Sequence, residues 1–215
     1  MPDFSQSAGT AEVQTALQAL QRTCMGPDGA FAGVDELVIT QSTFAGFSHR
    51  YGDMRTGDTW TFTTGRHRVP VSELAWLGEF KRSAFRPGFG SWITVRVHVF
   101  PDAPGFVEVF DEEIPASGGA GGVASRRVAT AGVLTSELLA FPRTVDHIPQ
   151  WMWDVFRADG ISPPVYNADL KTVDWDNKRL PVSDTGTDFS VDPAVIDPAK
   201  EPGVFSKISK KIFGK

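Results

Sequence analysis

The strongest constraint on the fold is the strict alternation of apolar and polar residues between positions 92 and 100. Successive side chains of a β-strand point to opposite faces, so this segment predicts a strand with one buried and one polar face. The apolar set is Ile93, Val95, Val97 and Val99, and the polar set is Thr94, Arg96 and His98. A turn at 101–105 (PDAPG) leads into the β-prone segment 106–110, which predicts an antiparallel hairpin.

Helical spacing occurs on both sides of this hairpin. Apolar residues at i, i+3, i+4 and i+7 predict a helix over 11–22 with Thr10 as its N-cap. A further helix is predicted to be capped by Ser72 and to carry Leu74, Leu77 and Phe80, and two more are predicted over 134–140 and 150–158. Strands are predicted over 37–41 and 58–63, and in the second of these Trp60 and Phe62 are expected on a buried face. Adjacent antiparallel strands with helices before and after them favour an α+β fold over a doubly wound sheet.

The distribution of charge predicts a boundary near residue 160. Residues 1–160 hold 13 Lys/Arg and 18 Asp/Glu and so carry the entire net charge of −5, whereas residues 161–215 hold eight of each. The later part is rich in Pro and Asp, and its apolar residues lack a sustained period. We therefore expect one α+β domain over 1–160 and a tail over 161–215. Within this tail, 161–203 is predicted to be mostly irregular, with Val173 and Trp175 able to dock on the domain.

Composition excludes several classes of function. A net charge of −5 argues against nucleic acid as a partner, and the one cysteine, Cys24, excludes an internal disulfide. Four histidines at wide spacing predict no metal site, and no segment approaches the roughly 18 apolar residues of a membrane span. The expected location is the cytoplasm, and Cys24, which has no obvious base nearby, is expected to be an inert thiol.

No catalytic or cofactor-binding motif is evident in the sequence. The segment 118–122 (GGAGG) lacks the spacing of a nucleotide-binding loop, and neither a nucleophile elbow nor a metalloprotease motif is present. His98 admits two interpretations, a surface pair with Glu108 across the hairpin or a general base oriented by Glu108 or Asp111. We favour the surface pair, so the sequence predicts a protein that is not an enzyme and that needs no cofactor.

Acidic residues cluster directly after the second strand of the hairpin, at Asp111, Glu112 and Glu113. Taken alone, such a run is most often a solvated strand end. On a rigid hairpin it could also meet a basic protein surface and accelerate its approach. We take these three carboxylates, together with Asp102 in the turn 101–105, as the candidate contacts with a protein partner.

Five segments carry a family resemblance: 77–82 (LGEFKR), 85–92 (FRPGFGSW), 106–115 (FVEVFDEEIP), 137–143 (ELLAFPR) and 148–152 (IPQWM). Their order resembles the YezG-like family of immunity proteins, in particular its actinobacterial type. The resemblance spans residues 10–157, and its most specific part is the closing FPR and IP-x-W signature. The sequence departs from the family in passing directly from Phe110 to Asp111, where an aromatic residue often intervenes.

The resemblance implies an antiparallel α+β domain that neutralises a co-encoded polymorphic toxin, in several relatives a nuclease, by covering its active site. The motif residues themselves favour a mainly structural role, with Trp92, Phe110, Phe141 and Trp151 as core anchors. For Arg143 we favour a bridge to the run 111–113 over a contact with the toxin. The alternative function is an adaptor that docks on a membrane or a secretion machine. That alternative depends on the basic amphipathic segment 205–215, where Phe205, Ile208 and Ile212 alternate with lysines.

Overall fold

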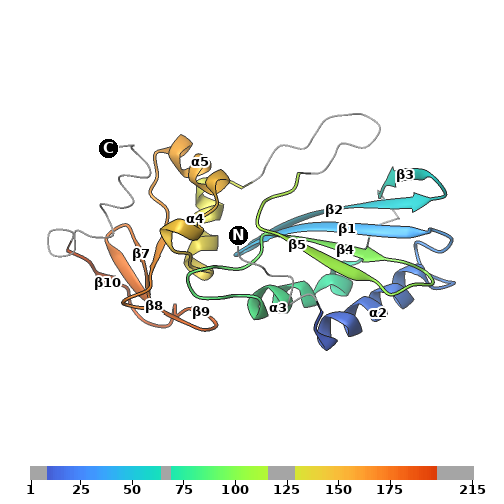
Figure 1. Cartoon of the computed structure of the whole chain (residues 1–215), viewed down its shortest axis with the longest axis horizontal. Helices are drawn as coiled ribbons and strands as arrows, with labels where there is room; N and C mark the ends of the chain where they lie inside the picture. Colours follow the sequence, from blue (N-terminus) through green and yellow to red (C-terminus); the bar gives the residue numbers. More distant parts are fainter. Residues whose placement is uncertain (1–8, 64–68, 116–128, 198–215) are drawn as a thin grey trace.

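The computed structural model of this chain describes residues 9–63, 69–115 and 129–197 (Figure 1). These residues form an α+β fold with two antiparallel sheets, which confirms the predicted fold class. The glycine-rich segment 118–122 and the basic segment 205–215 lie outside the described residues. The helices are α2 (Ala11–Met25), α3 (Trp76–Ser83), α4 (Ala131–Ala140) and α5 (Gln150–Asp159), with 3₁₀ turns η1 (Val71–Leu74) and η2 (Val145–His147). The strands are β1 (Glu36–Phe44), β2 (Phe47–Thr56), β3 (Thr59–Phe62), β4 (Thr94–Val99), β5 (Phe106–Phe110), β6 (Val165–Asn167), β7 (Thr172–Trp175), β8 (Lys178–Ser183), β9 (Gly186–Thr187) and β10 (Ala194–Val195).

The larger sheet has the strand order β3-β2-β1-β4-β5, and every neighbouring pair is antiparallel. The predicted hairpin is confirmed as β4 and β5, with His98 opposite Phe106 and Thr94 opposite Phe110. The apolar set of β4 is fully buried, as its alternation predicts. One face of this sheet therefore carries the core, and the residues of the other parity project from the opposite face.

Strand β2 was not anticipated from the sequence. It pairs with β1 through a tight turn at Ala45 and Gly46, and Gly46 has a φ of +78°, a conformation that glycine adopts without steric cost. Polar side chains lie on both of its faces, and Met54 packs partly buried against the core, so the segment shows no hydrophobic alternation. It forms a strand because β1 provides a paired edge.

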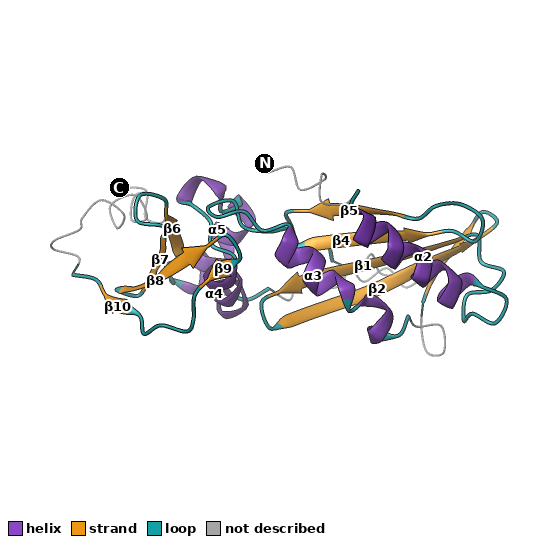
Figure 2. Ribbon diagram, turned by 90° about the horizontal axis from the view of Figure 1, so that it is seen from below, coloured by secondary structure: helices purple, strands orange, loops and turns teal. Residues whose placement is uncertain are grey.

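Helices α2 and α3 cover one face of the larger sheet, as Figures 1 and 2 show. Helix α2 confirms the prediction for 11–22, and the Thr10 hydroxyl accepts a hydrogen bond from the backbone N–H of Val13. Ser72 does not cap the second helix. It lies in η1, and α3 begins four residues later without a side-chain cap. The core beneath these helices includes Val13, Leu17, Leu20, Leu37, Ile39, Leu74, Leu77, Phe80, Trp92, Val95, Val97 and Val99.

Helices α4 and α5 lie between the two sheets (Figures 1 and 2). The Thr130 hydroxyl caps α4, and α5 ends at Gly160, whose φ of +66° lies in the left-handed region. Both helices lie close to their predicted positions. Phe44 and Ile93 from the ends of the larger sheet pack in one cluster with residues of these helices, including Leu134 and Trp153.

The prediction that 161–203 is irregular is wrong for residues 165–195. Strands β6, β7, β8 and β10 form a second sheet in the order β10-β8-β7-β6, and β9 pairs with β8. Val173 is completely buried against Phe85 and Leu180, so its docking is confirmed, and Trp175 packs partly buried against the same cluster. The strands are two to six residues long, too short to show a period in a Pro- and Asp-rich sequence. A local signal was present, because Asp176 and Asn177 adopt positive φ values in the tight turn between β7 and β8.

Candidate functional site

Asp111, a predicted contact with the protein partner, is instead buried in an ion pair that stabilises the fold. Its Oδ2 and Oδ1 accept hydrogen bonds of 2.8 and 2.6 Å from Nη1 and Nη2 of Arg143, whose side chain is completely buried. The predicted bridge from Arg143 is thereby confirmed. Arg143 also donates to the backbone oxygens of Ser91 (2.6 Å) and His147 (3.2 Å). It therefore joins the segment before β4 and the segment after β5 to the chain after α4.

The anchors implied by the resemblance lie around this pair. Trp92 is fully buried, whereas the side chains of Phe110, Phe141 and Trp151 are only partly buried. The indole Nε1 of Trp151 donates to the backbone oxygen of Asp111 at 2.9 Å.

A second buried ion pair lies close to the first. The Nζ of Lys81 is 2.8 Å from Oε1 of Glu137, and both side chains are nearly inaccessible to solvent. Burial lowers the pKa of Lys81, and the carboxylate of Glu137 opposes this shift. Glu137 also accepts a hydrogen bond from the backbone N–H of Ala45 in the β1–β2 turn. The Lys81–Glu137 pair thus joins α3 to α4, and Glu137 also joins α4 to the turn between β1 and β2.

The remaining predicted contact residues divide by exposure. Glu113 is buried, lies 3.1 Å from Nε2 of His49 and accepts from the backbone N–H of Ala129, so it too serves the fold. Glu112 and Asp102 are exposed and stay predicted contacts. The turn that holds Asp102 is fixed to α2, because Nε2 of Gln21 donates to three of its neighbouring backbone oxygens.

The face of the larger sheet opposite α2 and α3 is covered by no described helix, and we call it the open face (Figures 1 and 2). Register places aromatic and charged residues across all five of its strands. The aromatic and charged residues are Glu36, Tyr51, Asp53, Arg55, Trp60, Phe62, Arg96, His98, Phe106 and Glu108. Val38 and Thr40 of β1 lie among them on the same face. The expectation that Trp60 lies on a buried face is wrong. It projects from the open face with 51% of its surface exposed, and Phe106 is 44% exposed.

A chain of ion pairs crosses the open face. Nε of Arg55 lies 3.2 Å from Oε2 of Glu36, and Oε1 of Glu36 lies 3.0 Å from Nδ1 of His98. Oε2 of Glu108 then lies 3.0 Å from Nε2 of His98 and 3.4 Å from Nη1 of Arg96. Each of these charged groups therefore has a partner within the face.

The same contacts bear on the general-base hypothesis for His98. Each ring nitrogen lies 3.0 Å from a carboxylate oxygen, and the ring stacks on Phe106 with centroids 4.2 Å apart. A general base needs a ring nitrogen free to accept a proton, and here both nitrogens are engaged. The geometry favours the cross-strand pair with Glu108.

A shallow depression of about 360 Å³ lies in the centre of the open face. Three residues of β1 line it: Glu36, Val38 and Thr40. Tyr51, Asp53 and Trp60 of β2 and β3 lie on one side of β1, and Arg96 and His98 of β4 lie on the other. Burial raises the pKa of Asp53, and the attraction of Arg96 only partly offsets this effect. Burial also raises the pKa of Tyr51.

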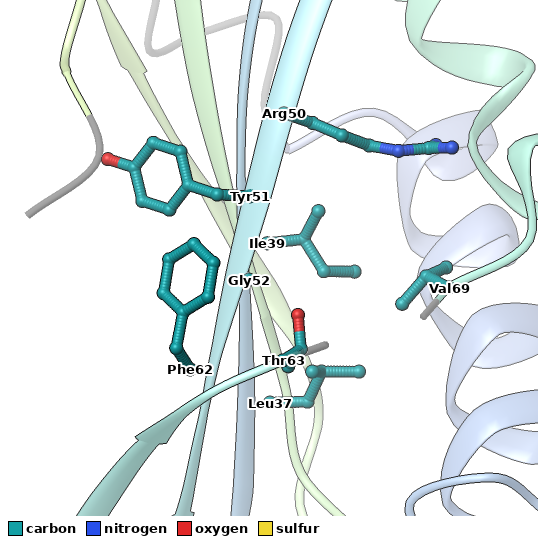
Figure 3. A pocket seen from close by; sticks show the side chains of 8 residues that line it. All are labelled: Leu37, Ile39, Arg50, Tyr51, Gly52, Phe62, Thr63 and Val69. Atoms are coloured by element: carbon teal, nitrogen blue, oxygen red, sulfur yellow. The ribbon is translucent and has the colours of Figure 1, made fainter. Parts of the chain in front are cut away.

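A second depression, of about 320 Å³, lies where β3 ends beside β2 (Figure 3). Leu37, Ile39 and Val69 project into its helix side, and Arg50 is the one charged residue among its described lining residues. Figure 3 also shows Tyr51 and Phe62 together on the opposite side of the strands, where their rings stack 6.1 Å apart. The described lining of this second depression holds fewer charged residues than the lining of the central depression, so we place the candidate site on the open face.

The sequence patterns did not predict the open face, because they did not predict β2. His49, Tyr51, Asp53 and Arg55 recur at a spacing of two, which is the signal of a strand that presents functional side chains. Such a signal is recognisable only once the strand has been assigned.

Three observations bear on other kinds of site. Within the described residues, no group of three or more His, Cys, Asp or Glu side chains could hold a metal ion. In that same part of the chain, no helix combines the length and the apolar character needed to cross a membrane. Burial raises the pKa of Cys24 to about 11, so its thiol is protonated near neutral pH, as expected for an inert cysteine.

Comparisons of the chain with protein-family models, with curated proteins and with solved structures found no match. The resemblance to YezG-like immunity proteins therefore stays a prediction from the sequence motifs.

Proposed function

We propose that this protein is an immunity protein, a stoichiometric inhibitor that binds a cognate toxin through the open face inside the producing cell. The motif order over residues 77–152 supports the class. The observation that carries the binding surface is the open face itself, where a rigid five-stranded sheet presents Trp60 and Phe106 to solvent.

The chemistry of the open face suits a protein partner. Exposed Trp, Tyr and Arg side chains dominate the energy of protein interfaces when they lie at the centre of a patch. Here Trp60, Tyr51 and Arg96 line the central depression. Apart from Asp53, the charged side chains around them are already paired with one another, so docking would require little reordering of these side chains.

The dimensions of the open face also suit a protein–protein interface. Five strands at a spacing of about 4.8 Å are about 19 Å wide, and the nine residues of β1 extend about 30 Å. The resulting area of about 600 Å² is close to the ~800 Å² per partner of a standard interface. A surface of this size can cover the active cleft of a small toxin and exclude its substrate.

The experiment is co-expression with the product of the neighbouring gene, followed by calorimetric titration of the purified pair. Trp60→Ala should weaken binding by about 30-fold if the residue is a hot spot worth about 2 kcal/mol. The matched control is Phe189→Ala, which removes a 60% exposed aromatic side chain away from the open face and should change affinity less than about twofold. Equal effects of the two substitutions would contradict the assignment of the surface. Absence of any complex or protection would contradict the proposed class.

A further inference from the structure

Asp53 differs from the other charged residues of the open face because its carboxylate has no partner among the residues that the structure describes. Glu36, Glu108, Arg55, Arg96 and His98 are joined in the chain of ion pairs described above. Within the described part of the chain, no side chain forms a hydrogen bond or an ion pair with the carboxylate of Asp53. An acidic group thus lies in the wall of the central depression with its charge uncompensated by a direct contact.

The neighbours of Asp53 explain why water does not fully compensate this charge. Register places Phe62 of β3 directly opposite Asp53 on one side, and Val38 of β1 on the other. These apolar side chains remove part of the hydration of the carboxylate. The result is a half-buried anion for which a cation would be a better partner than the present surroundings.

The two arginines of the open face are already engaged elsewhere. Nη1 of Arg96 lies 3.4 Å from Glu108, and its guanidinium lies over the ring of Phe110 at 5.1 Å, both on β5. Arg55 pairs with Glu36 instead of Asp53. Neither guanidinium neutralises Asp53 by direct contact.

Aromatic side chains form the other walls of the depression. Trp60 and Tyr51 both line it, and Arg55 already lies 6.0 Å from the centroid of Trp60, which shows that a guanidinium group is accommodated against this ring. A carboxylate beside exposed aromatic rings is the arrangement that binds guanidinium groups, because the planar cation can stack on a ring while donating two hydrogen bonds to the acid.

We propose that this depression is a subsite for an arginine side chain of the toxin, with Asp53 as the counter-ion and Trp60 and Tyr51 as the aromatic walls. The proposal rests on the proposed function, and it adds the chemistry of the partner: a basic surface with an arginine at its centre. Arginine is favoured over lysine because the aromatic walls suit a planar guanidinium group.

The test uses the full-length chain and a small probe, so that it does not depend on the toxin. N-acetyl-arginine amide is titrated while the indole N–H signal of Trp60, assigned by comparison with Trp60→Leu, is followed by NMR. N-acetyl-citrulline amide is the neutral probe of matched shape. Asp53→Asn keeps the size of the side chain, and Glu112→Gln is the control at an exposed carboxylate outside the depression.

A saturable shift of the Trp60 signal with the arginine probe is expected, together with binding about fivefold weaker in Asp53→Asn and less than twofold weaker in Glu112→Gln. Trp60→Leu, followed through the backbone amide of Asp53, should weaken binding by about two- to fivefold through loss of the aromatic contact. The proposal is overturned by the absence of saturation, by equal binding of the citrulline probe, or by unchanged affinity in Asp53→Asn. Any of these results would leave the toxin-binding experiment, and with it the proposed function, unaffected.

Discussion

Replacement of Arg143 by Met should be among the most destabilising single substitutions in this chain. The guanidinium is completely buried and makes two hydrogen bonds to Asp111 and one each to the backbone oxygens of Ser91 and His147. Met fills much of the volume but leaves the carboxylate of Asp111 buried without its partner. Removal of one member of a buried ion pair costs about 3–5 kcal/mol.

A loss of this size is a large fraction of the 5–15 kcal/mol that stabilises a typical domain. For a chain of about 200 residues, each kcal/mol corresponds to roughly 2–4 °C in Tm, so we expect Arg143→Met to lower Tm by about 6–20 °C. The assay is urea denaturation of the substituted and unsubstituted proteins, with thermal unfolding as a second measure. Arg157→Ala is the control, because its pair with Asp154 is exposed and should be worth less than about 1 kcal/mol.

The double substitution Asp111→Asn with Arg143→Met separates the ion pair from packing. With the buried charge removed as well, the combined loss should be smaller than the sum of the two single losses by about 1–3 kcal/mol. Additive losses, or a loss below about 1 kcal/mol for Arg143→Met, would refute the reasoning. Retained affinity per folded molecule would place Arg143 outside the toxin contact.

Three further results are expected. Burial raises the pKa of Asp53 in the folded state above its ordinary value of 3.8. The folded protein therefore gains stability while Asp53 is protonated, and it loses this stability as the pH rises from 3.8 through the folded pKa. Asp53→Asn should therefore raise the free energy of unfolding near pH 7 and have little effect below pH 3.8; a loss at neutral pH in urea titrations would contradict this. Cys24, with a pKa of about 11, should resist iodoacetamide at pH 8 until the chain unfolds, and rapid labelling of the native protein, measured by mass spectrometry, would be inconsistent with its burial. Deletion of 203–215 should leave toxin binding and protection intact in the co-expression assay, whereas loss of protection would favour the adaptor.

The larger sheet was predictable where hydrophobicity alternated. The alternating valines of β4 belong to the buried face, so the sequence alone predicts this strand and its hairpin partner. Strand β2 was not predictable by the same reasoning, because polar residues lie on both of its faces. The second sheet was not predictable for a different reason. Its core includes Phe85, which precedes β7 by more than eighty residues, so no local pattern shows this contact.

The candidate site shows a similar limit. A run of three acidic residues looks uniform in sequence, yet Asp111 and Glu113 turn into the protein while Glu112 between them is exposed. Successive side chains after β5 alternate in direction, so Asp111 and Glu113 point inward and Glu112 points to solvent. The burial of Asp111 also depends on its partner Arg143, which lies 32 residues away in the sequence. Arg143 was identifiable only through the family signature that contains it. Prediction of the open face would have required the correct pairing of all five strands.

Hydroxyl-radical footprinting of the complex with the neighbouring gene product tests the central claim most directly. Oxidation of Trp60 and Phe106, whose side chains are exposed on the open face of the free protein, should fall strongly when the complex forms. Phe189 should be oxidised equally with and without the partner. Unchanged oxidation of both Trp60 and Phe106 in a complex that protects other side chains would contradict binding through the open face.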